Sequence, residues 1–156
     1  MKNITFLAGV MLGMILLPYR IYAAEIKQET AIFAGGCFWS MQHDFEKFPG
    51  VISTTVGYTG GNVVNPSYEQ VSAGMTGHYE AIQIVYDLAK TNYSKLLDFY
   101  WHDTDPTNAT GQLLPAKSFY PAEDYHQHYS DKHPENYNAY RSGCRRDATL
   151  DAIWGN

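Results

Sequence analysis

One cysteine of this sequence has the surroundings of a nucleophile. Cys37 follows a pair of glycines and precedes two aromatic residues, Phe38 and Trp39. Residues 30–34 predict a short strand and the residues after Cys37 predict a helix, so the thiol lies where the strand gives way to the helix. Because backbone N–H groups at a helix N-terminus stabilise negative charge, we expect them to lower the pKa of this thiol and to favour the reactive thiolate.

A carboxylic acid in the clearest predicted strand is the candidate proton donor. Residues 77–86 alternate so that Glu80, Ile82 and Ile84 share one face of the strand. Burial without a cation raises the pKa of a carboxyl group and keeps it protonated near neutral pH, which makes Glu80 a candidate general acid. The alternative, that Glu80 lies at the frayed start of the strand and points into water, stays open.

The sequence contains a second cysteine, Cys144, so Cys37 could be either a reactive thiol or half of a structural disulfide. In an exported protein, a Cys37–Cys144 disulfide would tie the C-terminal segment to the core. The glycine pair and the helix N-terminus favour a reactive Cys37 instead, because a structural cysteine needs neither of them. A cysteine hydrolase that pairs Cys37 with a distant histidine is a further alternative.

The sequence lacks the motifs of other common reaction centres. The sequence has no CxxC or HExxH pattern for zinc, and His126 and His128 lie two positions apart in a predicted helix, where they do not face each other. The GxSxG elbow of serine hydrolases is absent, and the glycine pairs match no phosphate-binding loop. We therefore expect no metal site.

The elements that position these residues alternate between strands and helices. Asn65 and Pro66 predict the cap and the first residue of a short helix that carries Tyr68, and Asp147 predicts the cap of a last helix that ends at Gly155. The predicted strands cover 30–34, 51–58 and 77–86. The predicted helices before the last one cover 37–48, 67–71, which carries Tyr68, 91–102 and 121–132.

The N-terminus has the plan of a secretory signal peptide. Lys2 precedes an uncharged run over residues 6–17, and the small residues Ala23 and Ala24 follow. This run falls short of the ~20 residues that span a bilayer, although an uncleaved membrane anchor stays the alternative. We expect residues 1–24 to be removed, a single domain over 25–156, a periplasmic or secreted location, and no stable membrane insertion after cleavage.

Composition excludes several classes of protein. Of the 156 residues, 45% are apolar and 17% are charged, which is the balance of a globular domain rather than a disordered or collagen-like chain. Without residues 1–24 the chain keeps nine basic and sixteen acidic residues, a formal charge of −7, which does not suit nucleic acid. The basic group Arg141, Arg145 and Arg146 is predicted to be a solvated cluster near the chain end.

Several stretches together resemble the peptide methionine sulfoxide reductase A family. They occur in family order across nearly the whole of 25–156, and as an ordered set they are far more specific than a lone GCFW. The stretches are GGCFW at 35–39, GYTGG at 57–61, YEQV at 68–71, GHYE at 77–80 and FYPAEDYHQ at 119–127.

The resemblance implies an α/β fold, an α+β two-layer sandwich with a ferredoxin-like core. It also implies that methionine S-sulfoxide is reduced without a cofactor. Cys37 would attack the sulfoxide sulfur, Glu80 would protonate its oxygen, Tyr68 would hold that oxygen, and Phe38 and Trp39 would receive the substrate methyl group.

The resemblance further implies how the nucleophile is regenerated. Methionine would leave Cys37 as a sulfenic acid, and a second thiol would condense it to a disulfide. Cys144 is the candidate for this resolving role. A thioredoxin-like reductant would then restore both thiols, so the implied partners are oxidised proteins or peptides and an external thiol.

The sequence departs from the family pattern at Gln112, which runs directly into Leu113. Family members carry there a turn with an aspartate, a Gln-Tyr-Arg-Ser strand and a long helix. We expect one core strand to be missing, together with an aspartate and a tyrosine of the pocket, unless another segment refills the sheet. An error in the gene sequence would explain the junction equally well.

Two hypotheses of different classes follow from these observations. The first is an exported reductase of methionine S-sulfoxide in oxidised proteins, with activity weakened or lost through the missing segment. The second is a truncated, non-catalytic family member or binding module in which Cys37 and Cys144 form a structural disulfide.

Overall fold

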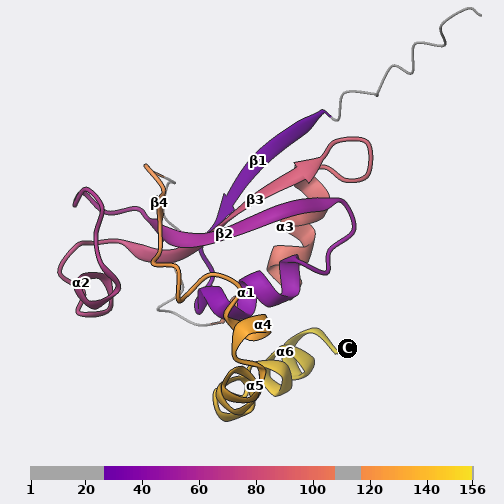
Figure 1. Ribbon diagram of the computed structural model, residues 1–156. Coiled ribbons are helices and arrows are strands. Elements are labelled where there is room, and N and C mark those ends of the chain that lie inside the picture. The colour runs from indigo at the N-terminus through magenta and orange to yellow at the C-terminus, as the bar shows by residue number, and fades with distance from the viewer. Residues whose placement is uncertain (1–26, 108–116, 156) are drawn as a thin grey trace, which may run out of the picture.

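The computed structural model describes residues 27–107 and 117–155, and its centre is one antiparallel sheet (Figure 1). The strands within these ranges are β1 (Gln28–Phe33), β2 (Val51–Thr59), β3 (Tyr79–Asp87) and the short β4 (Tyr120–Pro121). They pair in the order β1-β3-β2-β4. The expected α/β fold class is therefore confirmed, and the predicted strands 30–34, 51–58 and 77–86 correspond to β1, β2 and β3.

Two helices cover one face of this sheet. Phe33 of β1 stacks on Phe45 of α1 (Phe38–Phe45), with ring centroids 5.6 Å apart, and on Tyr100 of α3 (Tyr93–His102) at 5.0 Å. Phe33 lies opposite Ile82 in the β1–β3 register, so the alternating apolar residues of β3 face the same helices. Both α1 and α3 confirm the predicted helices within a few residues at each end.

The described strands pair with one another without a gap. β1 pairs with β3, β3 with β2, and β2 with β4, which places β1 along one edge of the sheet. A strand lost after Gln112 is therefore not lost from between these four. The Gln112–Leu113 junction itself lies outside the described residues.

The predicted helix over 121–132 is wrong for most of its length. Tyr120 and Pro121 instead form β4 beside Gly57, where an added Cβ would lie 2.3 Å from the Tyr120 carbonyl oxygen. The side-chain amide of Gln127 bonds both the N–H and the carbonyl of Val56 at 2.9 Å and so extends the pairing past the strand. These long-range bonds override the local signal of a proline that starts a helix, and only Tyr129–Lys132 is helical (α4).

Three further helices differ from the sequence prediction, two in their caps and one in its existence. α2 (Tyr68–Ser72) is capped by Ser67, which forms a capping box with Gln70, rather than by Asn65. α5 (Pro134–Gly143) was not predicted, although Pro134 at its first turn is a typical start signal. α6 (Arg146–Trp154) is preceded by Arg145 rather than by Asp147, and it ends at Gly155 as expected.

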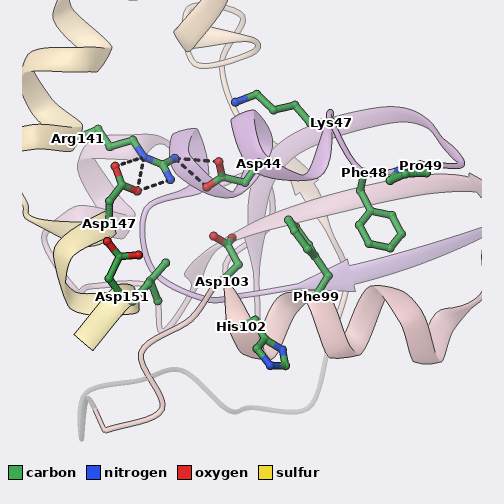
Figure 2. A pocket seen from close by; sticks show the side chains of 11 residues that line it. Asp44, Lys47, Phe48, Pro49, Phe99, His102, Asp103, Arg141, Asp147 and Asp151 are labelled. Atoms are coloured by element: carbon green, nitrogen blue, oxygen red, sulfur yellow. Dashed lines mark hydrogen bonds and ion pairs between the residues drawn. The ribbon is translucent and has the colours of Figure 1, made fainter. Parts of the chain in front are cut away.

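The C-terminal helices are attached to the domain through arginines. Arg141 of α5 bridges Asp44 of α1 at 2.7 Å and Asp147 of α6 at 2.6 Å, as Figure 2 shows. Arg146 pairs with Asp103 at the end of α3 at 2.9 Å. The expectation of a solvated basic cluster is therefore wrong for Arg141 and Arg146, because buried carboxylates draw both guanidinium groups inward.

Arg141, its partners Asp44 and Asp147, and Asp103 line a cavity of about 520 Å³ between α1, α3 and α6 (Figure 2). It contains no cysteine, and it lies on the side of α1 where the C-terminal segment docks. In the described ranges no helix combines the length and the apolar character needed to cross a bilayer.

Candidate active site

The backbone before Cys37 explains the two glycines. Gly36 has φ +92°, in the left-handed region that glycine adopts without strain. An added Cβ on Gly35 would lie 2.8 Å from the ring of Tyr100. The chain can therefore leave β1, pass close under α3 and deliver Cys37 to the N-cap of α1, as the sequence predicts.

Glu80 lies beside the start of α1, next to Cys37. Its Oε2 accepts a hydrogen bond of 2.9 Å from the backbone N–H of Phe38, the residue after Cys37. The carboxylate thus accepts one of the free N–H groups at the start of α1. Glu80 is half-buried at the start of β3, so the alternative in which it points freely into water does not hold.

Burial raises the pKa of the Cys37 thiol and of the Glu80 carboxyl group. The thiol of Cys37 is held above its ordinary pKa of 9.0 by burial and by the nearby Glu80 carboxylate, and hydrogen bonds from Tyr140 and from the backbone of Ser40 and Trp39 oppose this effect. The expectation of a lowered thiol pKa is therefore wrong, because burial outweighs the helix N-terminus. Burial also raises the pKa of Glu80 above 4.5, against the opposing bond from Phe38, as predicted.

Cys37 and Glu80 share a cavity of about 430 Å³ with the other predicted pocket residues. Phe38 and Trp39 from α1 and Tyr68 from α2 line it. Phe38 is almost fully buried, and its ring lies 6.4 Å from those of Trp39 and Tyr68, measured between centroids. The structure therefore brings together five of the six predicted site residues around one space.

Glu123 holds this pocket together and was not singled out from the sequence. Its carboxylate accepts one bond from the hydroxyl of Tyr58 at 2.8 Å and one from the backbone N–H of Tyr68 at 3.0 Å. These bonds help to lower its pKa, so Glu123 stays ionised and fixes the start of α2. The sequence signal was the FYPAEDYHQ stretch, but nothing in it shows which residues Glu123 contacts.

Trp39 is fixed on two sides. Its indole N–H donates to Nδ1 of His126 at 3.1 Å, and its ring stacks on that of Tyr129 with centroids 3.8 Å apart. Burial lowers the pKa of His126, which keeps the imidazole neutral and able to accept this bond. His126 therefore positions the wall of the pocket.

Cys144, the sixth predicted residue, lies at the C-cap of α5 and is exposed. Both cysteines are free thiols in the structure. They line a second cavity, of about 230 Å³, which adjoins the first at Cys37 and Tyr140. The second thiol thus lines one of the two cavities that meet at Cys37, and the acid lines the other.

His126 and His128 do not act as a pair. His128 lies outside any helix, with φ +51°, and its Nδ1 contacts Glu46 Oε1 at 2.7 Å. The ligand atoms of Glu46, His128 and Asp131 all lie within 4.8 Å of one another on the surface. This group is remote from the cavity of Cys37, where the chemistry available is that of a thiol, a proton donor and an apolar wall.

Comparison with known proteins identifies this constellation. The profile of the family described as "Peptide methionine sulfoxide reductase" matches residues 29–114 and 108–156. The chain belongs to this family. It is therefore an oxidoreductase that carries out thiol-dependent reduction of methionine sulfoxide.

Relatives of this reductase are similar over most of their length. Peptide methionine sulfoxide reductase MsrA 2 of Caulobacter vibrioides is 40% identical, over 85% of this chain and 88% of its own. The MsrA of Bacillus licheniformis is 38% identical, over 83% and 95%. The crystal structure of Mxr1 from Saccharomyces cerevisiae in reduced form superposes with a TM-score of 0.63 at 25% identity, over 70% of this chain and 87% of that one.

The same comparisons locate the departure from the family pattern. The alignment with the Caulobacter reductase is 173 residues long, more than the 156 residues of the whole chain, so that relative contains residues without a counterpart here. The family profile matches in two pieces, which overlap at residues 108–114 of this chain. This is the place at which the sequence predicts a missing segment, after Gln112.

Proposed function

We propose that this reductase acts on the S epimer of methionine sulfoxide in oxidised proteins and peptides, with Cys37 as nucleophile and Glu80 as general acid. The observation that carries this assignment is the 2.9 Å bond from Phe38 N–H to Glu80. It fixes the carboxyl group beside the thiol, in the cavity that Cys37 and Glu80 line together with Phe38, Trp39 and Tyr68.

The first step of the reaction uses one proton that Cys37 and Glu80 share. In the reactive form Cys37 is a thiolate and Glu80 a carboxylic acid. The Cys37 sulfur attacks the sulfoxide sulfur while Glu80 protonates the oxygen, which is transferred to Cys37. Methionine leaves, reduced by two electrons, and Cys37 becomes a sulfenic acid, oxidised by two; the shared proton ends on its oxygen.

The pocket residues orient the substrate for this attack. Phe38 and Trp39 provide the apolar surface for the methyl group of the sulfoxide, and the hydroxyl of Tyr68 donates to its oxygen. The pKa of Tyr68 is raised by burial and by Glu80, so the hydroxyl keeps its proton for donation. Glu123 supports this role by fixing the backbone of Tyr68.

Cys144 closes the cycle. Its thiol attacks the sulfur of the Cys37 sulfenic acid, the S–S bond forms, and water leaves with the sulfenic oxygen. A thioredoxin-like dithiol then reduces the disulfide and is itself oxidised. The reaction needs no bound cofactor. The cavity shared by the two cysteines supports this role, because it offers them a common space.

The proposed setting is outside the cytoplasm. The signal-peptide pattern over residues 1–24, which lies outside the described residues, supports export and repair of oxidised periplasmic or secreted proteins. Fusion of residues 1–30 to a reporter enzyme that is active only after export tests this location, and retention of the reporter in the cytoplasm would contradict it.

The assay for activity is the loss of methionine S-sulfoxide with dithiothreitol as reductant. We expect turnover of the S epimer, none of the R epimer, and loss of turnover in Cys37→Ser. The matched control is Cys144→Ser, which we expect to keep the dithiothreitol-driven reaction because dithiothreitol reduces the sulfenic acid directly. Turnover that survives in Cys37→Ser would sink the assignment of the nucleophile.

The role of Cys144 is tested by the choice of reductant. With thioredoxin we expect Cys144→Ser to lose most of its rate, whereas equal losses with both reductants would argue against a resolving role. A structural disulfide predicts a different result: it would resist mild reduction, and its loss would lower the melting temperature.

A further inference from the structure

Tyr140 stands between the two cavities of the active site. It lies near the end of α5 and lines the cavity of Glu80 and Tyr68 as well as the cavity of Cys144. Of the residues that line these two spaces, only Cys37 and Tyr140 belong to both. The tyrosine is thus placed where the sulfoxide must be reduced and where the disulfide must form.

The ring and the hydroxyl of Tyr140 are both held in place. The ring stands edge-on to Trp39, with centroids 5.7 Å apart and an interplanar angle of 82°. The hydroxyl lies close enough to the thiol of Cys37 for each group to shift the pKa of the other, and both residues line the same two cavities. A side chain anchored to the pocket wall therefore presents its polar end to the nucleophilic sulfur.

The protonation of the two groups makes the tyrosine the donor. Burial and the neighbouring Cys37 raise the pKa of Tyr140 well above 10.0, so its hydroxyl keeps its proton. The Tyr140 hydroxyl in turn acts to lower the pKa of Cys37, against the larger effect of burial. An O–H that donates to a thiolate is a charge-assisted bond, which is stronger than one to the neutral thiol.

The backbone couples this hydroxyl to the second thiol. The N–H of Cys144 donates to the carbonyl of Tyr140 at 2.9 Å, so the two residues lie one helical turn apart. Arg141, the residue next to Tyr140, ties this turn to Asp44 of α1. The donor and the second thiol are thus attached to the domain as one unit.

We propose that Tyr140 is a catalytic residue of this reductase, whose hydroxyl donates to the Cys37 sulfur during its attack on the sulfoxide and then holds the sulfenic acid toward Cys144. The inference rests on the proposed role of Cys37 as nucleophile. In the first step the bond offsets the burial of the thiolate. In the second the hydroxyl donates to the sulfenic oxygen, which leaves as water when the S–S bond forms.

The test replaces Tyr140 by phenylalanine, which keeps the ring against Trp39 and removes only the hydroxyl. Alkylation of Cys37 by iodoacetamide is measured against pH in the Cys144→Ser background, where Cys37 is the one remaining thiol. We expect the thiol pKa to rise and the rate near neutral pH to fall about tenfold, the effect of losing a hydrogen bond to a charged group. Tyr93→Phe, an exposed hydroxyl on α3, is the matched control and should leave the rate unchanged.

A second readout follows the chemistry itself. The reduced enzyme is mixed with one equivalent of methionine S-sulfoxide, and methionine and the Cys37–Cys144 disulfide are quantified over time. In Tyr140→Phe with both cysteines present we expect both to form about tenfold more slowly, at an unchanged melting temperature. Alkylation and single-turnover rates equal to those of the unmodified enzyme would overturn the role of Tyr140.

The two readouts separate this inference from the proposed function. If the unmodified enzyme does not reduce the sulfoxide, the proposed function fails, and with it the catalytic role of Tyr140. If it does reduce the sulfoxide and only the alkylation rate is insensitive to Tyr140→Phe, the donation to the thiolate is wrong, because that rate does not depend on sulfoxide.

Discussion

The carboxylate of Glu80 and the backbone N–H of Phe38 are joined by a hydrogen bond of 2.9 Å, so the acid is attached to the helix that begins after Cys37. The bond connects the start of β3 with the start of α1, across 42 positions of the sequence. The distance from acid to thiol is therefore set by backbone elements rather than by a flexible loop, which is the arrangement a proton transfer requires.

Glu80→Gln separates the two effects of this carboxylate. A glutamine still accepts the bond from Phe38, but it cannot donate the proton, and we expect the single-turnover rate to fall by about 10²- to 10⁴-fold. The Glu80 charge also raises the pKa of Cys37, so its removal should make the thiol more reactive toward iodoacetamide. A slower single turnover together with faster alkylation would identify Glu80 as the proton donor. A fall in both rates would indicate a structural defect instead. Glu135→Gln, an exposed change on α5, is the control.

The pH profile follows from the same pair. The reactive form has one proton on the pair, so the rate falls at low pH, where both groups are protonated, and at high pH, where neither is. Because both pKa values are raised, the acid limb should lie above pH 4.5 and the alkaline limb above pH 9.0. Single-turnover rates without added reductant measure this profile; an acid limb below 4.5 would contradict the burial of Glu80.

Arg141→Met tests the attachment of the C-terminal helices. The side chain of Asp44 is only 14% exposed, and the loss of its partner leaves a charge with little water, at a cost of about 2 kcal/mol in the free energy of unfolding. We expect a lower melting temperature and disulfide formation at least about tenfold slower, because α5 carries Cys144. Arg145→Met, at an exposed position four residues after Arg141, is the control and should change neither the melting temperature nor the rate of disulfide formation. Disulfide formation at the normal rate in Arg141→Met would exclude a role for the Arg141–Asp44 ion pair in positioning Cys144.

Gly36→Ala tests the approach of the chain to Cys37. At φ +92° an alanine is strained, and we expect a loss of about 1–2 kcal/mol in the free energy of unfolding together with slower alkylation of Cys37. Gly143→Ala makes the opposite prediction for stability, a gain of about 0.5–1 kcal/mol, because Gly143 lies in α5 with open space for a Cβ. Denaturant unfolding of both variants checks this contrast, which fails if both change in the same direction.

The parts of the fold that the sequence predicts are those with a strong local period. The alternation of Ile82 and Ile84 in β3 and the spacing of Met41 and Phe45 in α1 reflect burial on one side, and these residues are fully buried. The positions of Cys37 and Glu80 were predictable for the same reason, because each lies at the end of such an element. The departure after Gln112 was likewise visible in the order of the motifs.

The parts that were missed depend on contacts between distant segments. Pro121 has a local signal for a helix, but Gly57 and Gln127 recruit its segment to β2. The predicted direction of the thiol pKa shift was wrong because burial raises the pKa of Cys37, and the surroundings of Cys37 include residues far along the chain, such as Tyr140 of α5. A local pattern contains no information about such burial.

The packing of Trp39 gives the enzyme an internal fluorophore. Its indole stacks on Tyr129, contacts Tyr140 of α5 edge-on and donates to His126, so its emission depends on where α5 lies. With Trp101 and Trp154 replaced by phenylalanine, we expect the emission of this single tryptophan to change as Cys37 is oxidised. Each redox state could then be followed in real time, without a label and during a single catalytic cycle.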